Sequence, residues 1–296
     1  MSPPYPPLSG QAGTYWPLAV ATRGSHALLW RATTEDGTTV AIKVRDPDSG
    51  FPREWLEREG TLLGEWTRQG VPGIIPLMEM LDWNGEPALV LPWRPLTLGQ
   101  LKKSDWPSLR PLLATVAGTL ARLHQLGWIH GDVTPGNILL DTEGKSPSLT
   151  DFGLAKSLKV VPRSLPAANI SATPGFRHPR RPTPGTHTDW HSLAVCAWLL
   201  ATGTMPPSQA TLRQLVHLAK EYQLPEGLAW DLAWWLARGA STRRLRRWLE
   251  GKRRRLVPSR YRPWLQPGSW LFPGLIVVAM VLLLVAFWTY LSQPAP

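Results

Sequence analysis

The sequence predicts an α+β fold of two unequal lobes, a small β-rich lobe with one helix and a larger helical lobe, followed by one transmembrane helix. Three observations support this prediction. Residues 14–100 contain short β-type runs separated by turn signals, and residues 101–250 contain apolar positions at helical spacing. Residues 271–291 contain no charged side chain. With 296 residues, 43% of them hydrophobic, the chain can bury a core of this size.

The start of the chain differs from the rest in composition. Residues 1–13 are rich in proline and glycine and show no apolar period, so we expect a disordered leader. They lack the basic start and the apolar stretch of a signal peptide.

Two hairpins and one helix are expected in the β-rich lobe. The runs ALLWRAT and TTVAIKVR flank Asp36-Gly37, a dipeptide typical of a hairpin turn. Residues 53–69 carry apolar side chains at helical spacing. A second pair of strands is expected to meet at Asn84-Gly85.

The larger lobe is expected to be helical. Residues 108–127 keep apolar positions at i, i+3, i+4 and i+7, and residues 189–203 predict a buried helix that ends at Gly203. Residues 228–251 predict one or two further helices. The single cysteine, Cys196, lies in the buried helix, which indicates a structural thiol, excludes an intrachain disulfide and fits a reducing compartment.

The positive charge of the chain is local. Net charge is +11, and residues 241–270 contribute nine of these charges, through ten Lys and Arg against Glu250. The uncharged run 271–291 is long enough to cross a bilayer core of about 30 Å as a helix. Basic flanks stay cytoplasmic, so we expect a cell-membrane protein with a single span, its main domain (14–250) in the cytoplasm and its short tail (292–296) outside.

This local charge has two further consequences. A basic juxtamembrane segment, residues 251–270, is expected to attract anionic membrane lipids. Because the charge belongs to the membrane flank, we expect no nucleic-acid partner.

The segment IHGDVTPGNILLDTEGKSPSLTDFGLAK carries the chemistry. It has the pattern H-x-D-x-x-x-x-N followed by D-F-G, with Asp132, Asn137 and Asp151 in order. Asp and Asn supply the oxygen ligands that Mg²⁺ prefers, and Asp132 follows a predicted helix on a loop where it could accept a proton. This order of groups is typical of phosphoryl transfer.

Phosphoryl transfer also needs a cation, and Lys43 in VAIKV is the candidate. Glu59 is its expected carboxylate partner, because Leu63 lies one turn later on the same helix face and could pack inward. Glu54 and Glu57 remain alternatives.

With these motifs the chain resembles bacterial Ser/Thr protein kinases of the eukaryotic-like (Hanks) type, from about Thr14 to Leu249. The resemblance implies a bilobal protein-kinase fold, with ATP and Mg²⁺ (or Mn²⁺) as cofactors and Ser/Thr of proteins as substrates. It implies that Asp132 accepts the proton and that Asn137 and Asp151 bind the metal. It also implies a nucleotide site, bordered by Gly24, Leu29, Ala41, Lys43, Leu91, Trp93, Arg94, Leu139 and Asp151. Two further residues are expected at the catalytic loop, Asp189 as a backbone anchor and Thr173 beside Asp132.

The sequence departs from the family pattern at four places. Only the middle glycine, Gly24, remains of the G-x-G-x-x-G nucleotide cover, which predicts weaker nucleotide binding. Gly131 replaces the arginine that reads an activation-loop phosphate, so arginine-dependent switching is not expected. Thr134 replaces the lysine that would stabilise the transferred phosphate, which predicts a slower reaction. Arg180 replaces the acid that ends the A-P-E motif.

The first expectation is therefore a membrane-anchored Ser/Thr protein kinase. The alternative is a catalytically weak or dead pseudokinase that acts as a nucleotide-binding scaffold at the membrane. A small-molecule kinase of the aminoglycoside or choline type also uses an H-G-D loop, but the DFGLAK, TPGF and DWHSLAV segments argue against it. The sequence carries no dedicated signal for oligomerisation.

Overall fold

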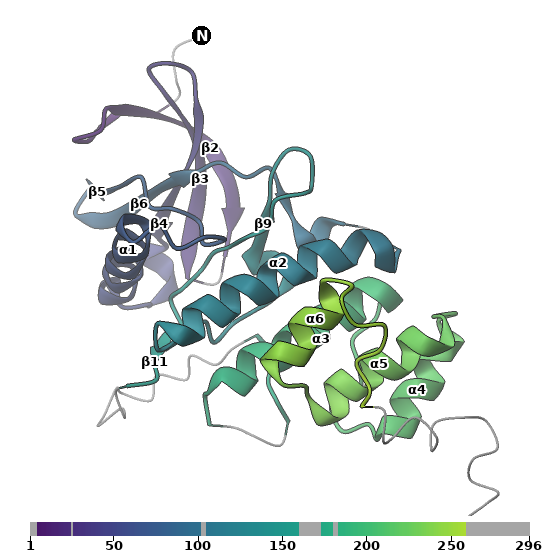
Figure 1. Cartoon of the computed structure of the whole chain (residues 1–296). Helices are drawn as coiled ribbons and strands as arrows, with labels where there is room; N and C mark the ends of the chain where they lie inside the picture. The colour runs from purple at the N-terminus through teal and green to yellow at the C-terminus, as the bar shows by residue number, and fades with distance from the viewer. Residues whose placement is uncertain (1–4, 25, 102–104, 160–172, 180–182, 259–296) are drawn as a thin grey trace, which may run out of the picture.

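A six-stranded antiparallel sheet with one helix forms the smaller lobe of the molecule, and helices form the larger lobe (Figure 1). The structure is a computed structural model, and it describes residues 5–24, 26–101, 105–159, 173–179 and 183–258. The predicted division into a strand-rich first part and a helical second part is confirmed.

The sheet of the smaller lobe has the strand order β1-β2-β3-β4-β6-β5. Its strands are β1 (Leu8–Ser9), β2 (Thr14–Arg23), β3 (Ala27–Thr34), β4 (Thr39–Arg45), β5 (Glu79–Trp83) and β6 (Glu86–Pro92). Both predicted hairpin turns are present. Asn84 and Gly85 have φ of 55° and 84°, as the turn between β5 and β6 requires, and Gly37 has φ of 80° between β3 and β4.

The prediction of a disordered leader is wrong for residues 5–13. Strand β1 pairs with β2, with Leu8 opposite Tyr15. The carboxylate of Glu79 accepts hydrogen bonds from the backbone N–H groups of Gln11 and Ala12, the second at 3.2 Å. Glu79 lies more than 60 residues away in the chain, so the local composition of residues 5–13 gave no sign of this contact.

Helix α1 (Arg53–Arg68) packs against the sheet. It buries Leu56, Leu63 and Trp66. Gly60 allows a close approach, because a Cβ there would lie 2.5 Å from the sulfur of Met80. The helix therefore presents Glu59, which neighbours Gly60, to the sheet.

The larger lobe is built around α3. Its helices are α2 (Trp106–Gln125), α3 (Thr186–Thr202), α4 (Leu212–Glu221), α5 (Glu226–Arg238) and α6 (Thr242–Leu249). Figure 1 shows α2 running between the sheet and the other helices. Helix α3 is buried around most of its circumference and ends at Gly203 (φ 82°), as predicted. Cys196 is fully buried there, and burial raises the pKa of its thiol.

Two features of this lobe were not predicted in detail. Helix α4 was missed, although Thr211 and Gln214 form a capping box at its start. The segment predicted as one or two helices is two, α5 and α6, separated at Gly239 with φ of 69°.

Short strands and 3₁₀ turns form the connecting segments of the molecule. The strands are β7 (Leu96–Thr97), β8 (Trp128–Ile129), β9 (Ile138–Leu140), β10 (Ser148–Leu149) and β11 (Lys156–Ser157). The 3₁₀ turns are η1 (Pro47–Ser49), η2 (Leu98–Gln100) and η3 (Pro135–Asn137). Strands β7, β9 and β10 form one small sheet, and β8 pairs with β11. The loop between β8 and β9 is thereby fixed at both ends.

The folded lobe continues beyond residue 250, where the sequence predicted its end. Leu256 and Val257 are completely buried. Their backbone N–H groups donate to the carboxylate of Asp231 at 2.9 and 3.0 Å, and Arg255 Nε donates to the same carboxylate at 3.0 Å. The first part of the predicted juxtamembrane segment is thus part of the domain.

The predicted transmembrane helix (271–291) and tail (292–296) lie outside the described residues, as does Arg180. Within the described part of the chain, no helix is both long and apolar enough to cross a bilayer.

Candidate active site

A buried lysine lies between two carboxylates at the junction of the lobes. Lys43 on β4 donates to Glu59 Oε1 and Oε2 of α1 at 2.9 and 2.7 Å, and to Asp151 Oδ1 at 3.0 Å. The Lys43 side chain is 15% exposed and that of Glu59 is 3% exposed. Of the three glutamates considered from the sequence, the structure therefore places Glu59 against Lys43; Glu57 pairs instead with Arg53 in the first turn.

Lys43 stabilises the charge of both carboxylates, but burial and the nearby charge of Asp151 raise the pKa of Glu59. Burial alone would lower the pKa of Lys43, but the carboxylates of Asp151 and Glu59 outweigh burial and raise it. The Lys43 ammonium lowers the pKa of Asp151. Lys43 is therefore cationic and Asp151 anionic at neutral pH.

Asp151 has a strained backbone and a partly open side chain. Its φ is 64°, in the left-handed region that few residues other than glycine adopt. Its side chain is 49% exposed, so the carboxylate can reach a ligand from the solvent side. The next residue, Phe152, is completely buried between the rings of Trp66 and His130, at centroid distances of 4.9 and 4.6 Å. Phe152 N–H also donates to Glu59 Oε1 at 3.2 Å, which joins this segment to α1.

Asp132 lies on the loop between β8 and β9 with both carboxylate oxygens engaged. Its Oδ1 accepts from Thr173 N–H at 2.8 Å, and its Oδ2 accepts from Thr173 Oγ1 at 3.1 Å. Oδ2 also accepts from Asn137 Nδ2 at 3.2 Å. Thr173 therefore lies beside Asp132, as the sequence indicated, and fixes the orientation of its carboxylate.

Asn137 is oriented by the same loop. Its Nδ2 donates to the Asp132 carbonyl oxygen at 2.9 Å as well as to the carboxylate, so both amide protons are used and Oδ1 remains as an acceptor. The hydroxyl of Thr134 accepts from Asn137 N–H at 3.3 Å and begins the turn η3. Sequence reasoning treated Thr134 only as a missing lysine and overlooked this capping role, although T-P-G-N is itself a turn signal.

Asp189 anchors the backbone of the loop between β8 and β9, as expected. It is completely buried on α3 and accepts from His130 N–H and Gly131 N–H, both at 2.9 Å. His124 Nε2 donates to it at 2.8 Å. His130 Nε2 lies 3.0 Å from the Thr150 carbonyl oxygen, which can only accept, so Nε2 carries the proton.

The backbone conformation of Gly131 offers a second explanation for a glycine where the family pattern has an arginine. Its φ is 85°, and a Cβ would lie 2.7 Å from the carbonyl oxygen of Leu154. A side chain at this position requires the neighbouring backbone to move.

Most of the residues expected to border the nucleotide lie on β3, β4, β6 and β9 and on the segment that follows β6. Ala41 and Leu91 are buried and are paired in register across β4 and β6. Leu29, Trp93 and Leu139 are partly buried against the same core. Arg94 Nε is buried and has no hydrogen-bond partner among the described residues.

The turn between β2 and β3 contains Gly24, the glycine expected to cover the nucleotide. Gly24 N–H donates to the Ala27 carbonyl oxygen at 2.9 Å, which closes the turn. The turn is fastened to η1, because the His26 ring stacks on Phe51 at 4.1 Å and the His26 carbonyl accepts from Asp46 N–H at 3.0 Å. The turn is therefore held in place by these contacts, although it has only one of the three glycines of the family pattern.

Asn137 and Asp151 are the two residues expected to bind a metal ion. Among the described residues there is no group of three His, Cys, Asp or Glu side chains that could hold a metal ion unaided. Asn137 Oδ1 and the partly exposed carboxylate of Asp151 are hard oxygen donors, the type that suits a divalent cation also bound by phosphate oxygens. The two residues therefore fit such an ion.

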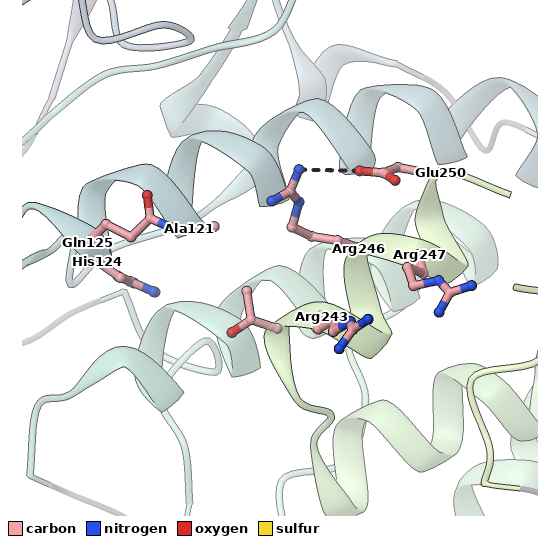
Figure 2. Close-up of a pocket in the computed structure, with 8 residues that line it drawn as sticks. Ala121, His124, Gln125, Arg243, Arg246, Arg247 and Glu250 are labelled. Carbon is pink, nitrogen blue, oxygen red and sulfur yellow. Dashed lines mark hydrogen bonds and ion pairs between the residues drawn. The ribbon is translucent and has the colours of Figure 1, made fainter. Parts of the chain in front are cut away.

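A cavity of about 580 Å³ lies apart from this site, between α2 and α6. Figure 2 shows Arg243, Arg246 and Arg247 of α6 around it, with Arg246 paired to Glu250. Of the site residues described above, His124 is the one that lines this cavity. Its Nε2 donates to Asp189.

Comparison with known proteins places the site in context. The family model of the protein kinase domain matches residues 23–235. The DNA damage-responsive serine/threonine-protein kinase RqkA of Deinococcus radiodurans is 30% identical over 261 residues, which cover 78% of this chain and 38% of that protein. Serine/threonine-protein kinase PknK of Mycobacterium tuberculosis is 30% identical over 198 residues, 61% of this chain and 17% of the relative. Serine/threonine-protein kinase PkaB of Streptomyces coelicolor is 30% identical over 203 residues, 62% of this chain and 47% of the relative. The chain thus spans less than half the length of each of these relatives.

Proposed function

Because this chain belongs to the protein kinase family, we propose that it transfers the γ-phosphate of ATP to serine and threonine hydroxyls of proteins. One observation carries the proposal: Lys43 is held in place by Glu59 and Asp151, at 2.7 and 3.0 Å. A phosphate-binding cation needs such fixed carboxylates to keep it charged and correctly placed. The three relatives named above are called serine/threonine kinases, which supports the substrate class.

Asp132 is proposed to receive the proton of the substrate hydroxyl. Thr173 and Asn137 hold its carboxylate in one orientation, so the carboxylate is preorganised to accept the proton. Lys43 would bind phosphate oxygens of the nucleotide and offset their charge.

Members of the family use ATP with a divalent metal, and we propose Mg²⁺ here, with Mn²⁺ as an alternative. Asn137 and Asp151 would hold the ion, which supplies charge neutralisation at the phosphates. Leu29, Ala41 and Leu139 would enclose adenine, and Leu91, Trp93 and Arg94 would border it at the hinge. Gly24 would lie over the phosphates.

Regulation is proposed to differ from that of arginine-switched kinases. Gly131 offers no side chain to read a phosphate on the activation segment. Its left-handed backbone also makes the site a poor one for an arginine.

A catalytically weak or dead scaffold remains the second candidate. It is favoured by Thr134, which carries no charge and whose hydroxyl is committed to Asn137 N–H. Such a protein would bind ATP without transferring phosphate.

We also propose that the chain is anchored in the cell membrane by residues 271–291, with the kinase domain cytoplasmic and the C-terminus outside. The uncharged run and the basic residues before it support this orientation. Anionic lipids would be attracted by the basic residues. A reporter fused after Pro296 tests the topology, and a cytoplasmic signal from it would refute the orientation.

Phosphate transfer is tested with the full chain in detergent, using Mg²⁺, labelled ATP and a general protein substrate. Wild type and the control Asp82→Asn, a hairpin-turn position away from the site, should transfer label to serine and threonine. Asp132→Asn should not, while binding ATP normally. ATP binding without transfer by the wild type would reject the kinase in favour of the scaffold.

A further inference from the structure

A second cavity, of about 640 Å³, lies where α2 begins, beside α5 and the segment that follows α6. Its lining comprises Trp106, Arg110, Gly227, Leu228, Asp231, Trp248, Gly251, Lys252, Arg253, Arg254 and Arg255. Five of these side chains are cationic and only Asp231 is acidic.

The acidic groups in and beside this cavity are already paired. Asp231 is 2% exposed and is bound by Arg255 and by the backbone N–H groups of the two following residues. Lys252 pairs with Glu250 at 2.9 Å. Arg110 and Arg254 form no ion pair with any carboxylate of the described residues. The cavity is therefore strongly positive.

Arg110 gives a second indication of a ligand. Its Nε is buried and has no hydrogen-bond partner in the described part of the chain. A buried donor without an acceptor is costly, so a missing acceptor is the simplest explanation. Gly251 leaves room for this guanidinium, since a Cβ there would lie 3.2 Å from Arg110 Nη2.

The cavity also has an apolar wall. The rings of Trp106 and Trp248 lie with centroids 5.1 Å apart, and Leu228 is beside them. A ligand that combines an anionic group with apolar atoms suits such a site better than a fully hydrated anion does.

We propose that this cavity binds the phosphate-bearing headgroup of an anionic membrane lipid. The inference rests on the proposed membrane attachment. It assigns the attraction of anionic lipids to one defined site instead of to the basic residues as a group. Twelve residues separate the last described residue, Pro258, from the apolar run that begins at Leu271. Such a stretch spans at most about 40 Å when extended, so the cavity stays within reach of the bilayer surface.

The test uses the full chain in nanodiscs of phosphatidylcholine, with phosphatidylglycerol added stepwise. Hydrogen–deuterium exchange of residues 251–257 is followed by mass spectrometry. Arg110→Ala/Arg254→Ala removes two cations from the cavity. Arg243→Ala/Arg247→Ala is the control, because it removes two exposed cations of α6 that line the other cavity (Figure 2).

Phosphatidylglycerol should slow exchange at 251–257 in the wild type and in the control. In Arg110→Ala/Arg254→Ala the half-saturating fraction of anionic lipid should rise, by roughly five-fold for each cation removed. The single variant Arg254→Ala changes an exposed position and should raise the half-saturating fraction by roughly five-fold. It serves as the control in case the double variant misfolds.

Equal effects of the two double variants, or no protection by phosphatidylglycerol, would overturn the proposal. Protection by inorganic phosphate alone, or by a phosphoserine peptide in neutral discs, would assign the cavity to a ligand other than lipid. Flotation with neutral discs and phosphate transfer are measured on the same samples. If both persist while protection is absent, the lipid site fails and the proposed anchoring and activity stand.

Discussion

Replacing Glu59 by glutamine tests the arrangement on which the proposed chemistry depends. The Glu59 carboxylate receives two hydrogen bonds from Lys43 and one from Phe152 N–H, and its side chain is 3% exposed. Glutamine keeps the shape but removes the charge, and its amide group would face the Lys43 ammonium. Within the described part of the chain, Lys43 would then keep Asp151 as its one anionic partner, and it would be drawn away from α1.

The expected loss follows from this geometry. A hydrogen bond to a charged group contributes about 1.5–3 kcal/mol, and removing one partner of a buried ion pair costs about 3–5 kcal/mol. Glutamine retains one acceptor, so the loss should be closer to that of a charged hydrogen bond, at about 2–3 kcal/mol. This corresponds to a fall in kcat/KM of roughly 30- to 150-fold.

The assay is steady-state phosphate transfer with ATP varied, with thermal unfolding measured alongside. Glu57→Gln is the matched control on the same helix, because the Glu57 side chain is 41% exposed and, among the described residues, its carboxylate pairs with Arg53. It should leave kcat/KM within about two-fold of wild type, as expected for an exposed ion pair. Equal effects of the two substitutions, or an unchanged rate in Glu59→Gln, would refute the role assigned to Glu59.

Four other substitutions or conditions test separate parts of the structure. Thr173→Val removes one hydrogen bond to Asp132 and should lower kcat by roughly 5- to 10-fold with KM for ATP unchanged; Thr173→Ser should restore kcat, and a failure to do so would count against positioning by the hydroxyl. Gly131→Ala should lower the free energy of unfolding in urea by about 1–3 kcal/mol because of its positive φ; an unchanged midpoint would contradict the strain argument. A chain cut after Glu250 loses two buried apolar side chains and should be less stable than the full chain by about 3 kcal/mol or more; equal stability would restore the shorter domain. Burial raises the pKa of Tyr15 to about 12, so its contribution to stability is complete below about pH 10 and is lost as pH rises toward 12; Tyr15→Phe should flatten this alkaline loss in denaturation curves, and an identical slope would exclude Tyr15 as its source.

Local patterns in the sequence were enough to predict much of the fold. The Asp36-Gly37 and Asn84-Gly85 turns follow from backbone preferences of the residues themselves, and both are present. The pairing of Glu59 with Lys43 followed from the side of the helix on which Leu63 lies. In these cases a short-range preference and the three-dimensional structure agree.

Long-range partners explain the errors. Residues 5–13 have no apolar period, yet Glu79 and the edge of the sheet hold them in place. Residues 251–257 were assigned to the membrane flank because of their charge. Asp231, some 25 residues earlier, binds them into the domain instead.

The catalytic loop shows why a comparison of residue types is incomplete. Thr134 and Gly131 were judged by the basic side chains that they lack. The structure shows what they do: one hydroxyl caps the turn at Asn137, and one glycine allows a backbone conformation that a side chain would strain. Such roles depend on dihedral angles and on neighbours, which residue types alone do not specify.

The most direct measurement of the central claim is a single-turnover experiment with enzyme in excess over labelled ATP and Mg²⁺. Phosphoserine and phosphothreonine are quantified by mass spectrometry. The account predicts that the wild type forms them from the γ-phosphate and that Asp132→Asn forms none while binding the same ATP. Equal product from both proteins, or bound ATP with no phosphorylated residue in the wild type, would contradict the assignment of Asp132 and Lys43 to phosphate transfer.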